Sequence, residues 1–181
     1  THHYLRGTEA GVRRGQAVVR LLMSLKASGF VPDVVFSHPG WGESLFVKDV
    51  FPRAKLIVYL EFYYRAFGSD VNFDPEFPAS LDDVFRLRIK NTVQLLSLEQ
   101  ADAAVSPTQW QAAQFPAVFR ERIAVMHDGI DTDLILPGDA SLTLPGTGPG
   151  LALRKGDEIV TFVARNLEPY RGFQTLMRAI P

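Results

Sequence analysis

Cysteine is absent from this chain of 181 residues, which excludes disulfide bonds and thiolate metal sites and fits a reducing compartment. The formal net charge is only −1, so the chain lacks the basic surplus that is typical of nucleic-acid-binding domains. No apolar run approaches the roughly 20 residues that a membrane-spanning helix needs. We therefore predict a cytoplasmic protein with no nucleic-acid partner and no membrane span.

The fingerprints of several enzyme classes are also missing. The chain contains no Gly-x-Ser-x-Gly, which marks many hydrolases, no Gly-x-Gly-x-x-Gly, which marks dinucleotide-binding enzymes, and no Walker loop. Its four histidines show no metal-ligand spacing, so we predict no metal site. These absences count against a hydrolase or a dehydrogenase.

What the chain does contain is an alternation of helical and strand-like segments. Its length and its 46% hydrophobic content are enough for a domain with a substantial core. Short apolar runs predict strands, and amphipathic stretches with capping signals, such as Thr8 before the first helix, predict helices. Strands are expected at 32–37, 55–60, 101–105, 122–126 and 159–164, and helices at 8–28, 44–50, 81–100, from 109 onward and at 173–180. This alternation predicts an α/β fold, with a parallel Rossmann-like sheet and helices on both faces.

A stretch rich in proline and glycine separates the last strand and helix from the rest. Residues 138–158 are predicted to be a linker, because they show neither helical nor strand periodicity. The predicted organisation is therefore a first domain over residues 1–137, this linker, and a further β-α unit over residues 159–181.

A histidine follows the first predicted strand. His38 stands at the carboxyl end of residues 32–37, where ligands bind in open α/β sheets. The turn that continues to Glu43 contains two glycines, which let the backbone approach a ligand closely. A lone histidine is more often structural than catalytic, but its position on this turn, with an acid nearby, favours a functional role.

An acidic residue and an aromatic-rich loop follow the second predicted strand. Glu61 is the first residue after this strand, and the residues that follow mix phenylalanine and tyrosine with carboxylates, without periodicity. Aromatic faces beside carboxylate acceptors suit sugar binding, although simple packing is the favoured interpretation for most of these aromatics. Glu61 is the exception, because it stands at a strand end.

Asp128 and Gly129 follow the fourth predicted strand. Asp-Gly predicts a tight turn. A turn with no further role is the simplest interpretation.

Two arginines flank the turn between the last predicted strand and helix. Arg165 and Arg171 lie beside a helix N-terminus, an arrangement that suits the binding of a diphosphate. The alternative is that they are surface arginines that pair with Glu168 or Asp157. The residues by themselves leave both interpretations open.

Several motifs resemble those of retaining glycosyltransferases with the GT-B fold, glycosyltransferase family 4. Arg165 and Arg171-Gly172 resemble the Arg…Lys-Gly pair at the start of the family's C-terminal domain, with Arg171 in place of the usual lysine. The other motifs are spread over nearly the whole chain and are His38-Pro-Gly-Trp-Gly-Glu43, Glu61-Phe-Tyr-Tyr-Arg65, Phe73-Asp-Pro-Glu-Phe77, Ser106-Pro-Thr-Gln-Trp110 and His127-Asp-Gly-Ile-Asp131.

The resemblance implies a partial GT-B architecture and a retaining sugar transfer. The donor would be a nucleotide-sugar and the acceptor a glycan or small molecule, with no cofactor and no obligatory metal. The resemblance assigns His38 a catalytic position in the cleft and gives the donor diphosphate to Arg165, Arg171 and Gly172. The weaker candidates for the acceptor or the cleft are Glu43, Glu61, Asp128 and Gly129.

The resemblance covers the later N-terminal domain and the start of the C-terminal domain. We therefore expect a fragment that is inactive by itself, from an enzyme that is cytoplasmic or peripheral to the membrane. A free sheet edge beside residues 33–37 would invite pairing with a second copy, which makes a homodimer a hypothesis. The competing function is a non-catalytic α/β module that binds a glycan or a phosphate ligand.

Overall fold

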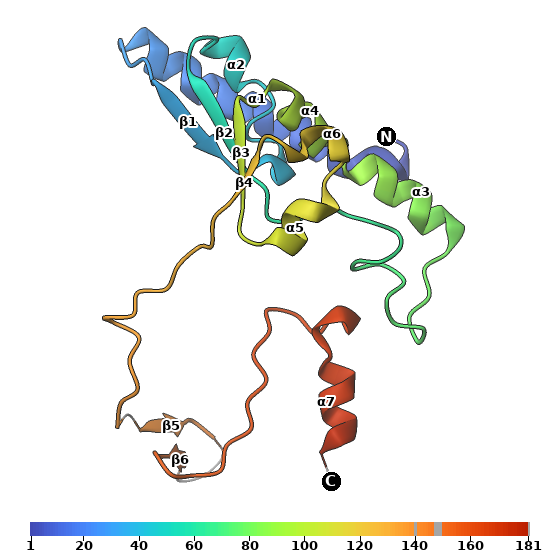
Figure 1. The fold of residues 1–181 in the computed structure, drawn as a ribbon, viewed down its shortest axis with the longest axis vertical. Helices are drawn as coiled ribbons and strands as arrows, with labels where there is room; N and C mark the ends of the chain where they lie inside the picture. Colours follow the sequence, from blue (N-terminus) through green and yellow to red (C-terminus); the bar gives the residue numbers. More distant parts are fainter. Residues whose placement is uncertain (140, 147–149, 181) are drawn as a thin grey trace. The chain divides into compact units, whose positions relative to one another are not determined.

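The computed structural model describes residues 1–139, 141–146 and 150–180. The chain divides into two compact units, Thr1–Asp128 and Gly129–Pro181. Most of the helices and strands belong to the first unit, in which a sheet packs against helices (Figure 1).

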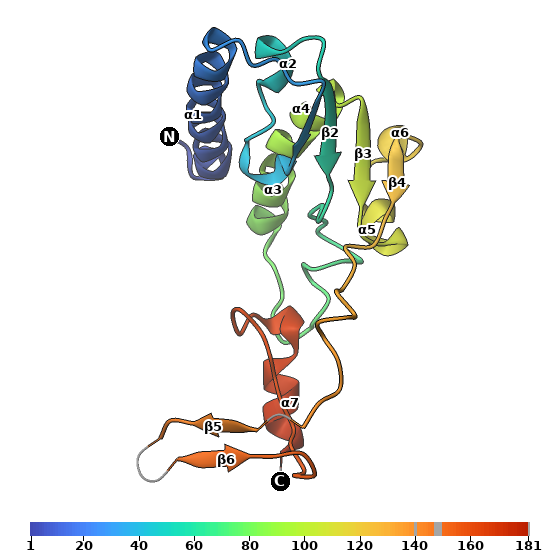
Figure 2. The same cartoon turned by 90° about the vertical axis from the view of Figure 1, so that its left-hand side faces the viewer.

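The first unit is built on a parallel four-stranded sheet with the strand order β1-β2-β3-β4. The strands are β1 (Val34–Ser37), β2 (Lys55–Tyr59), β3 (Ala103–Ser106) and β4 (Ile123–Val125). Figure 2 shows β2, β3 and β4 side by side and pointing the same way. The α/β class and the parallel, Rossmann-like sheet predicted from the alternating pattern are confirmed.

The helices of the first unit precede and connect these strands. They are the 3-10 turn η1 (His3–Leu5), α1 (Arg6–Ala27), the 3-10 turn η2 (Pro39–Trp41), α2 (Val47–Val50), α3 (Leu81–Lys90), α4 (Thr92–Gln100), α5 (Gln109–Gln114) and α6 (Ala117–Arg120). Ser80 forms a capping box with Asp83 at the start of α3, and Thr108 caps α5 by accepting a hydrogen bond from the Gln111 amide.

Two helix predictions need correction. The helix expected at residues 81–100 is two helices, α3 and α4, which meet at Asn91, a buried residue whose side chain bonds the backbone of Tyr64. Thr8 is not an N-cap, since α1 already begins at Arg6, directly after η1. Both differences come from neighbouring structure that local propensity does not contain.

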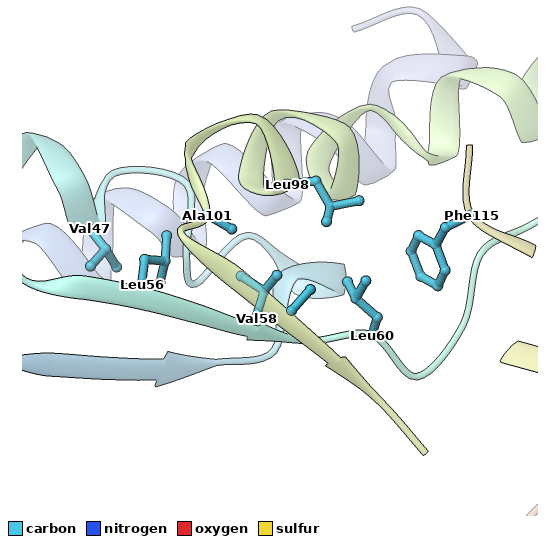
Figure 3. Close-up of a cluster of buried hydrophobic side chains, with 8 residues drawn as sticks. Val47, Leu56, Val58, Leu60, Leu98, Ala101 and Phe115 are labelled. Carbon is cyan, nitrogen blue, oxygen red and sulfur yellow. The ribbon is translucent and has the colours of Figure 1, made fainter. Parts of the chain in front are cut away.

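The hydrophobic core lies on one face of the sheet. Leu56 and Val58 of β2, and Leu60 directly after β2, are almost fully buried. They pack against residues from the helices and their flanks, which are Val47, Leu98, Ala101 and Phe115 (Figure 3). Since parallel crossovers are right-handed, strands that follow one another in order carry their connections over the same face.

The opposite face of β1 is open. Val34 and Phe36, which alternate with the partly buried Val35, are exposed. In the first unit, β1 is therefore partly buried on one face only.

The second unit contains a hairpin and a short helix. The hairpin pairs β5 (Leu142–Leu144) with β6 (Leu151–Leu153), and a 3-10 turn, η3 (Pro169–Arg171), leads into α7 (Phe173–Ala179). The hairpin lies in the stretch predicted to be a linker, of which residues 140 and 147–149 lie outside the described residues. The helix expected at 173–180 is confirmed.

The strand expected at residues 159–164 is not formed. Val160 and Val163 are exposed, and among the described residues no strand pairs with this run. A strand needs a neighbour that satisfies its backbone N–H and C=O groups, and composition alone does not supply one.

Among the described residues, no helix is long and apolar enough to cross a membrane.

Candidate functional site

Side chains from three strand ends meet at the carboxyl edge of the parallel sheet. His38 follows β1, Glu61 follows β2 and Asp128 follows β4, while Tyr59 is the last residue of β2. His38 Nε2 lies 3.3 Å from Glu61 Oε2, and the Tyr59 hydroxyl donates a hydrogen bond of 2.7 Å to Asp128 Oδ1. The Tyr59 ring connects the two pairs, since its centroid lies 6.1 Å from that of His38. We call these four residues the edge cluster.

The turn after β1 determines which nitrogen of His38 carries the proton. The Gly40 amide donates a hydrogen bond of 3.1 Å to His38 Nδ1, so Nδ1 is an acceptor. The proton of the neutral ring therefore sits on Nε2, which faces the Glu61 carboxylate. The Glu61 side chain is more exposed than the imidazole, so a ligand at this edge meets a carboxylate acceptor and, behind it, an N–H donor.

Tyr59 is the member of the cluster that the sequence analysis missed. The Asp128 carboxylate, which accepts its hydrogen bond, raises the pKa of Tyr59 to about 12. The hydroxyl therefore stays protonated at neutral pH and holds Asp128 in place. The available signal was its strand position, because Tyr59 alternates with the buried Val58 and so faces away from the core.

Glu43 belongs to a different group, which we call the α1 brace. Arg14 of α1 donates a hydrogen bond of 2.8 Å from Nη1 to the Trp41 carbonyl, and its guanidinium lies 5.7 Å from the centre of the Trp41 ring. Its Nε lies 3.7 Å from Glu43 Oε1. The carboxylate of Glu43 therefore pairs with Arg14 and not with His38, and the brace holds the turn on which His38 sits.

Glycines allow α1 to approach this turn closely. A Cβ built on Gly15 would lie 2.8 Å from the carbonyl oxygen of Gly42, and one on Gly11 would lie 2.9 Å from Cγ2 of Val93. Gly42 itself has φ +103°, and a Cβ there would overlap the backbone of Gly11. Helix α1 and the turn at Gly42 approach each other backbone to backbone, which only residues without a side chain permit.

The predicted diphosphate residues lie in the second unit. Arg171 Nε is 2.7 Å from Glu168 Oε2, whereas Arg165 is exposed. Hydrogen bonds from Asn166 and Arg171 lower the pKa of Glu168 to about 2, and Glu168 in turn raises the pKa of Arg171. The pairing of Arg171 with Glu168 was the surface alternative in the sequence analysis, and it leaves the diphosphate role untested.

Gly172 and Gly129 both adopt left-handed backbone conformations. Their φ values are +74° and +82°, a region that favours glycine. Gly172 separates η3 from α7, and Gly129 is the first residue of the second unit. In the described ranges, no group of three or more His, Asp or Glu side chains is arranged to hold a metal ion.

Residues 1–135 match a family model whose description is Glycosyl transferase family 4 group. The chain belongs to this glycosyltransferase family. The comparison with curated proteins gave no match. The family match covers the whole first unit, including the edge cluster and the α1 brace.

Membership of a glycosyltransferase family implies sugar substrates. The edge cluster lies at the strand ends where open α/β sheets bind ligands. Arg165, Arg171 and Gly172 lie beyond residue 135, outside the matched range, so their role in this glycosyltransferase stays a prediction.

Proposed function

We propose that this glycosyltransferase chain takes part in a retaining transfer of a sugar from a nucleotide-sugar to a hydroxyl group of an acceptor. The observation that carries the proposal is the His38–Glu61 pair, 3.3 Å apart at the carboxyl edge of a sheet that belongs to the family-matched unit. An N–H donor beside an exposed carboxylate is suited to a sugar hydroxyl, which both donates and accepts hydrogen bonds.

Each member of the pair has a distinct role in this proposal. His38 Nε2–H donates a hydrogen bond to an oxygen of the transferring sugar, and the Glu61 carboxylate accepts a hydrogen bond from the acceptor hydroxyl. Tyr59 and Asp128 position the cluster, since the hydroxyl that joins them stays protonated. Glu43 acts through Arg14, by holding the turn that carries His38.

The transfer exchanges one C–O bond for another. The acceptor oxygen bonds to the anomeric carbon on the face that the diphosphate leaves, the bond from that carbon to the diphosphate oxygen breaks with its electron pair, and the acceptor proton passes to that oxygen. Arg165 and Arg171 stabilise the charge that develops on the diphosphate, the kind of electrostatic contribution that is usually the largest in such reactions. The proposal assigns this task to guanidiniums and requires no metal ion.

Activity of the full chain tests the role of His38, and any measurable rate would overturn the sequence-based expectation that the chain is inactive by itself. The assay measures release of nucleoside diphosphate from a panel of UDP-, GDP- and ADP-sugars, with and without oligosaccharide acceptors. His38→Ala is expected to lower the rate by about 100-fold, the usual contribution of one positioned catalytic side chain. His2→Ala, at an exposed position outside the cluster, is the matched control and is expected to leave the rate unchanged.

Calorimetric titration with UDP, GDP and ADP tests the diphosphate role separately. Replacing Arg165 and Arg171 together by alanine is expected to abolish nucleotide binding. The double variant Arg154→Ala, Arg178→Ala removes the same charge from the same unit and is expected to retain nucleotide binding. Chelation with EDTA is expected to leave the affinity unchanged. If the first double variant binds like the parent, the diphosphate lies elsewhere.

The two experiments together separate the two candidate functions. Release of diphosphate from any donor excludes the non-catalytic binding module. A rate that His38→Ala leaves unchanged contradicts the proposed role of the edge cluster.

A further inference from the structure

The loop between β2 and α3 exposes aromatic side chains. Residues 60–80 contain neither helix nor strand, and we call residues 62–80 the aromatic loop (Figure 1). Phe67, Phe73 and Phe77 are 71%, 50% and 47% exposed. Large apolar side chains that gather on one exposed segment mark binding surfaces more often than scattered ones do.

Hydrogen bonds close the base of the aromatic loop. The Asn72 amide group donates a hydrogen bond of 3.1 Å to the Ala66 carbonyl and accepts one of 2.6 Å from the Ala79 amide. Asn72 has φ +56° and is the one non-glycine residue with positive φ in the described part of the chain. These bonds join the two ends of the segment that carries the three phenylalanines.

A second clamp ties the start of the loop to the helices. Asn91 makes two hydrogen bonds with the backbone of Tyr64, and Lys90 Nζ lies 3.5 Å from the centre of the Tyr64 ring. The rings of Phe62 and Tyr64 pack edge to face. These aromatics hold the loop down, so the three exposed phenylalanines are presented from a fixed base, and less ordering is needed when a ligand binds.

The charge of the aromatic loop limits the class of partner. Arg65 is its one basic residue, against the three carboxylates of Asp70, Asp74 and Glu76. A net negative loop repels anionic lipid headgroups, phosphodiester backbones and diphosphates. These charges disfavour an anionic partner, and a neutral partner with an apolar face for the phenyl rings and hydroxyl groups for the carboxylates is compatible with both features of the loop.

We propose that the aromatic loop binds a neutral oligosaccharide, and that this oligosaccharide is the acceptor. A pyranose ring has an apolar C–H face that packs on an aromatic ring and a rim of hydroxyls that donate to carboxylates. The loop begins one residue after Glu61 of the edge cluster, so a chain of sugar units bound along it leads to the transfer site. The identification of this oligosaccharide as the acceptor rests on the proposed function, whereas the binding of an oligosaccharide to the loop does not.

The test replaces the three exposed phenylalanines together by alanine in the full chain. The probes are neutral linear hexasaccharides of glucose, mannose and galactose, titrated calorimetrically. We expect at least one of them to bind, and the triple variant to bind it about tenfold more weakly or worse, as expected when exposed aromatic anchors are lost. The control variant carries Leu21→Ala, Met23→Ala and Val118→Ala, three exposed apolar residues of α1 and α6, and is expected to bind like the parent.

Asn72→Ala provides an independent variant that leaves every ring in place. Loss of the bonds that close the loop is expected to weaken binding of the same hexasaccharide by several-fold, while the circular dichroism spectrum stays the same. Donor hydrolysis without acceptor is expected to be equal in the parent and the triple variant. In transfer to the hexasaccharide, the triple variant is expected to show a higher KM for the hexasaccharide than the parent.

Four outcomes overturn the inference. They are failure of every hexasaccharide to bind, equal binding by the parent and the triple variant, binding of the parent to phosphatidylglycerol vesicles through the same phenylalanines, and a dimer that the triple variant abolishes. Failure of the proposed function is recognised differently, as a rate that His38→Ala leaves unchanged or nucleotide binding that the Arg165→Ala, Arg171→Ala variant leaves unchanged, while hexasaccharide binding persists.

Discussion

Two apolar runs of similar appearance have different structures in the two units. Residues 34–37 form a strand, β1, which pairs with β2 along its whole length. Residues 159–164 are at least as rich in β-branched side chains, yet they form no strand, and Val160 and Val163 are 83% and 92% exposed. Strand propensity is realised only where a neighbouring strand and a packed face are present.

The same contrast holds for the ion pairs of the two units. In the first unit Asp102 joins Lys48, Lys55 and the Leu56 amide, which come from α2 and β2. In the second unit Arg171 and Glu168 are three residues apart on one turn. The Asp102 contacts of the first unit thus join elements distant in sequence, whereas the Arg171–Glu168 pair of the second unit joins residues of one turn.

The largest expected effect is in amide hydrogen exchange. We expect amides of β2 to exchange about a thousandfold more slowly than those of residues 159–164, because the former open only with the core of the unit and the latter have no partner strand. Exchange measured by mass spectrometry on peptides of the full chain checks this. Equal protection of the two runs would show that residues 159–164 do pair in solution.

Truncation of the core tests the first unit directly. Leu56 is 0% exposed, and Leu56→Ala is expected to lower the free energy of unfolding by about 3 kcal/mol, through lost burial and the cavity left behind. Val118→Ala removes an exposed side chain from the same unit and is expected to change it by less than about 0.5 kcal/mol. Urea unfolding followed by tryptophan fluorescence isolates this unit, since Trp41 and Trp110 both belong to it.

Glycine substitutions in α1 test the close approach of the helix to the His38 turn. Gly15→Ala is expected to lower the free energy of unfolding by about 2 kcal/mol, because its Cβ meets the Gly42 carbonyl oxygen at 2.8 Å. Gly7→Ala, on the same helix with nothing within 4 Å of its Cβ, is the matched control, expected to stabilise by up to about 1 kcal/mol through helix propensity. Equal effects at the two positions would mean that α1 does not brace the turn.

The smallest effect is the pH dependence of the Asp102 contacts. Lys48, the Leu56 amide and Lys55 hold the pKa of Asp102 well below its usual range. A carboxyl group with a lowered folded-state pKa stabilises the fold fully above its unfolded-state pKa of about 3.9, and this contribution is lost as the pH falls through the folded-state pKa.

Asp102→Asn is therefore expected to lower the free energy of unfolding by about 1 kcal/mol at pH 7 and by progressively less below about pH 4. Urea unfolding at a series of pH values measures the difference. Glu168→Gln, which removes a carboxylate from a local pair of the second unit, is the comparison and is expected to leave the unfolding of the first unit unchanged. A cost of Asp102→Asn that does not vary with pH would contradict the assigned contacts.

The members of the edge cluster differ in how well the sequence predicted them. His38 and Glu61 were candidates because each follows a predicted strand, and Asp128 was a candidate through the family resemblance. Tyr59 was missed because it lies within a strand, where its role depends on which residues the neighbouring strands bring beside it. Glu43 was a candidate for the acceptor, but its partner is Arg14, on a helix that local spacing does not place beside the turn.

The sequence by itself determined the alternation of helices and strands, the parallel class of the sheet and the residues at its strand ends, because hydrophobic periodicity and turn chemistry are local properties. Tertiary structure decided which apolar runs became strands, where the helix predicted at 81–100 broke, and which acid faced His38. These outcomes depend on hydrogen-bond partners and packed faces contributed by residues far away in the chain. Asn91 is the plainest case, since the expected helix is divided at this residue, whose side chain makes two hydrogen bonds with the Tyr64 backbone.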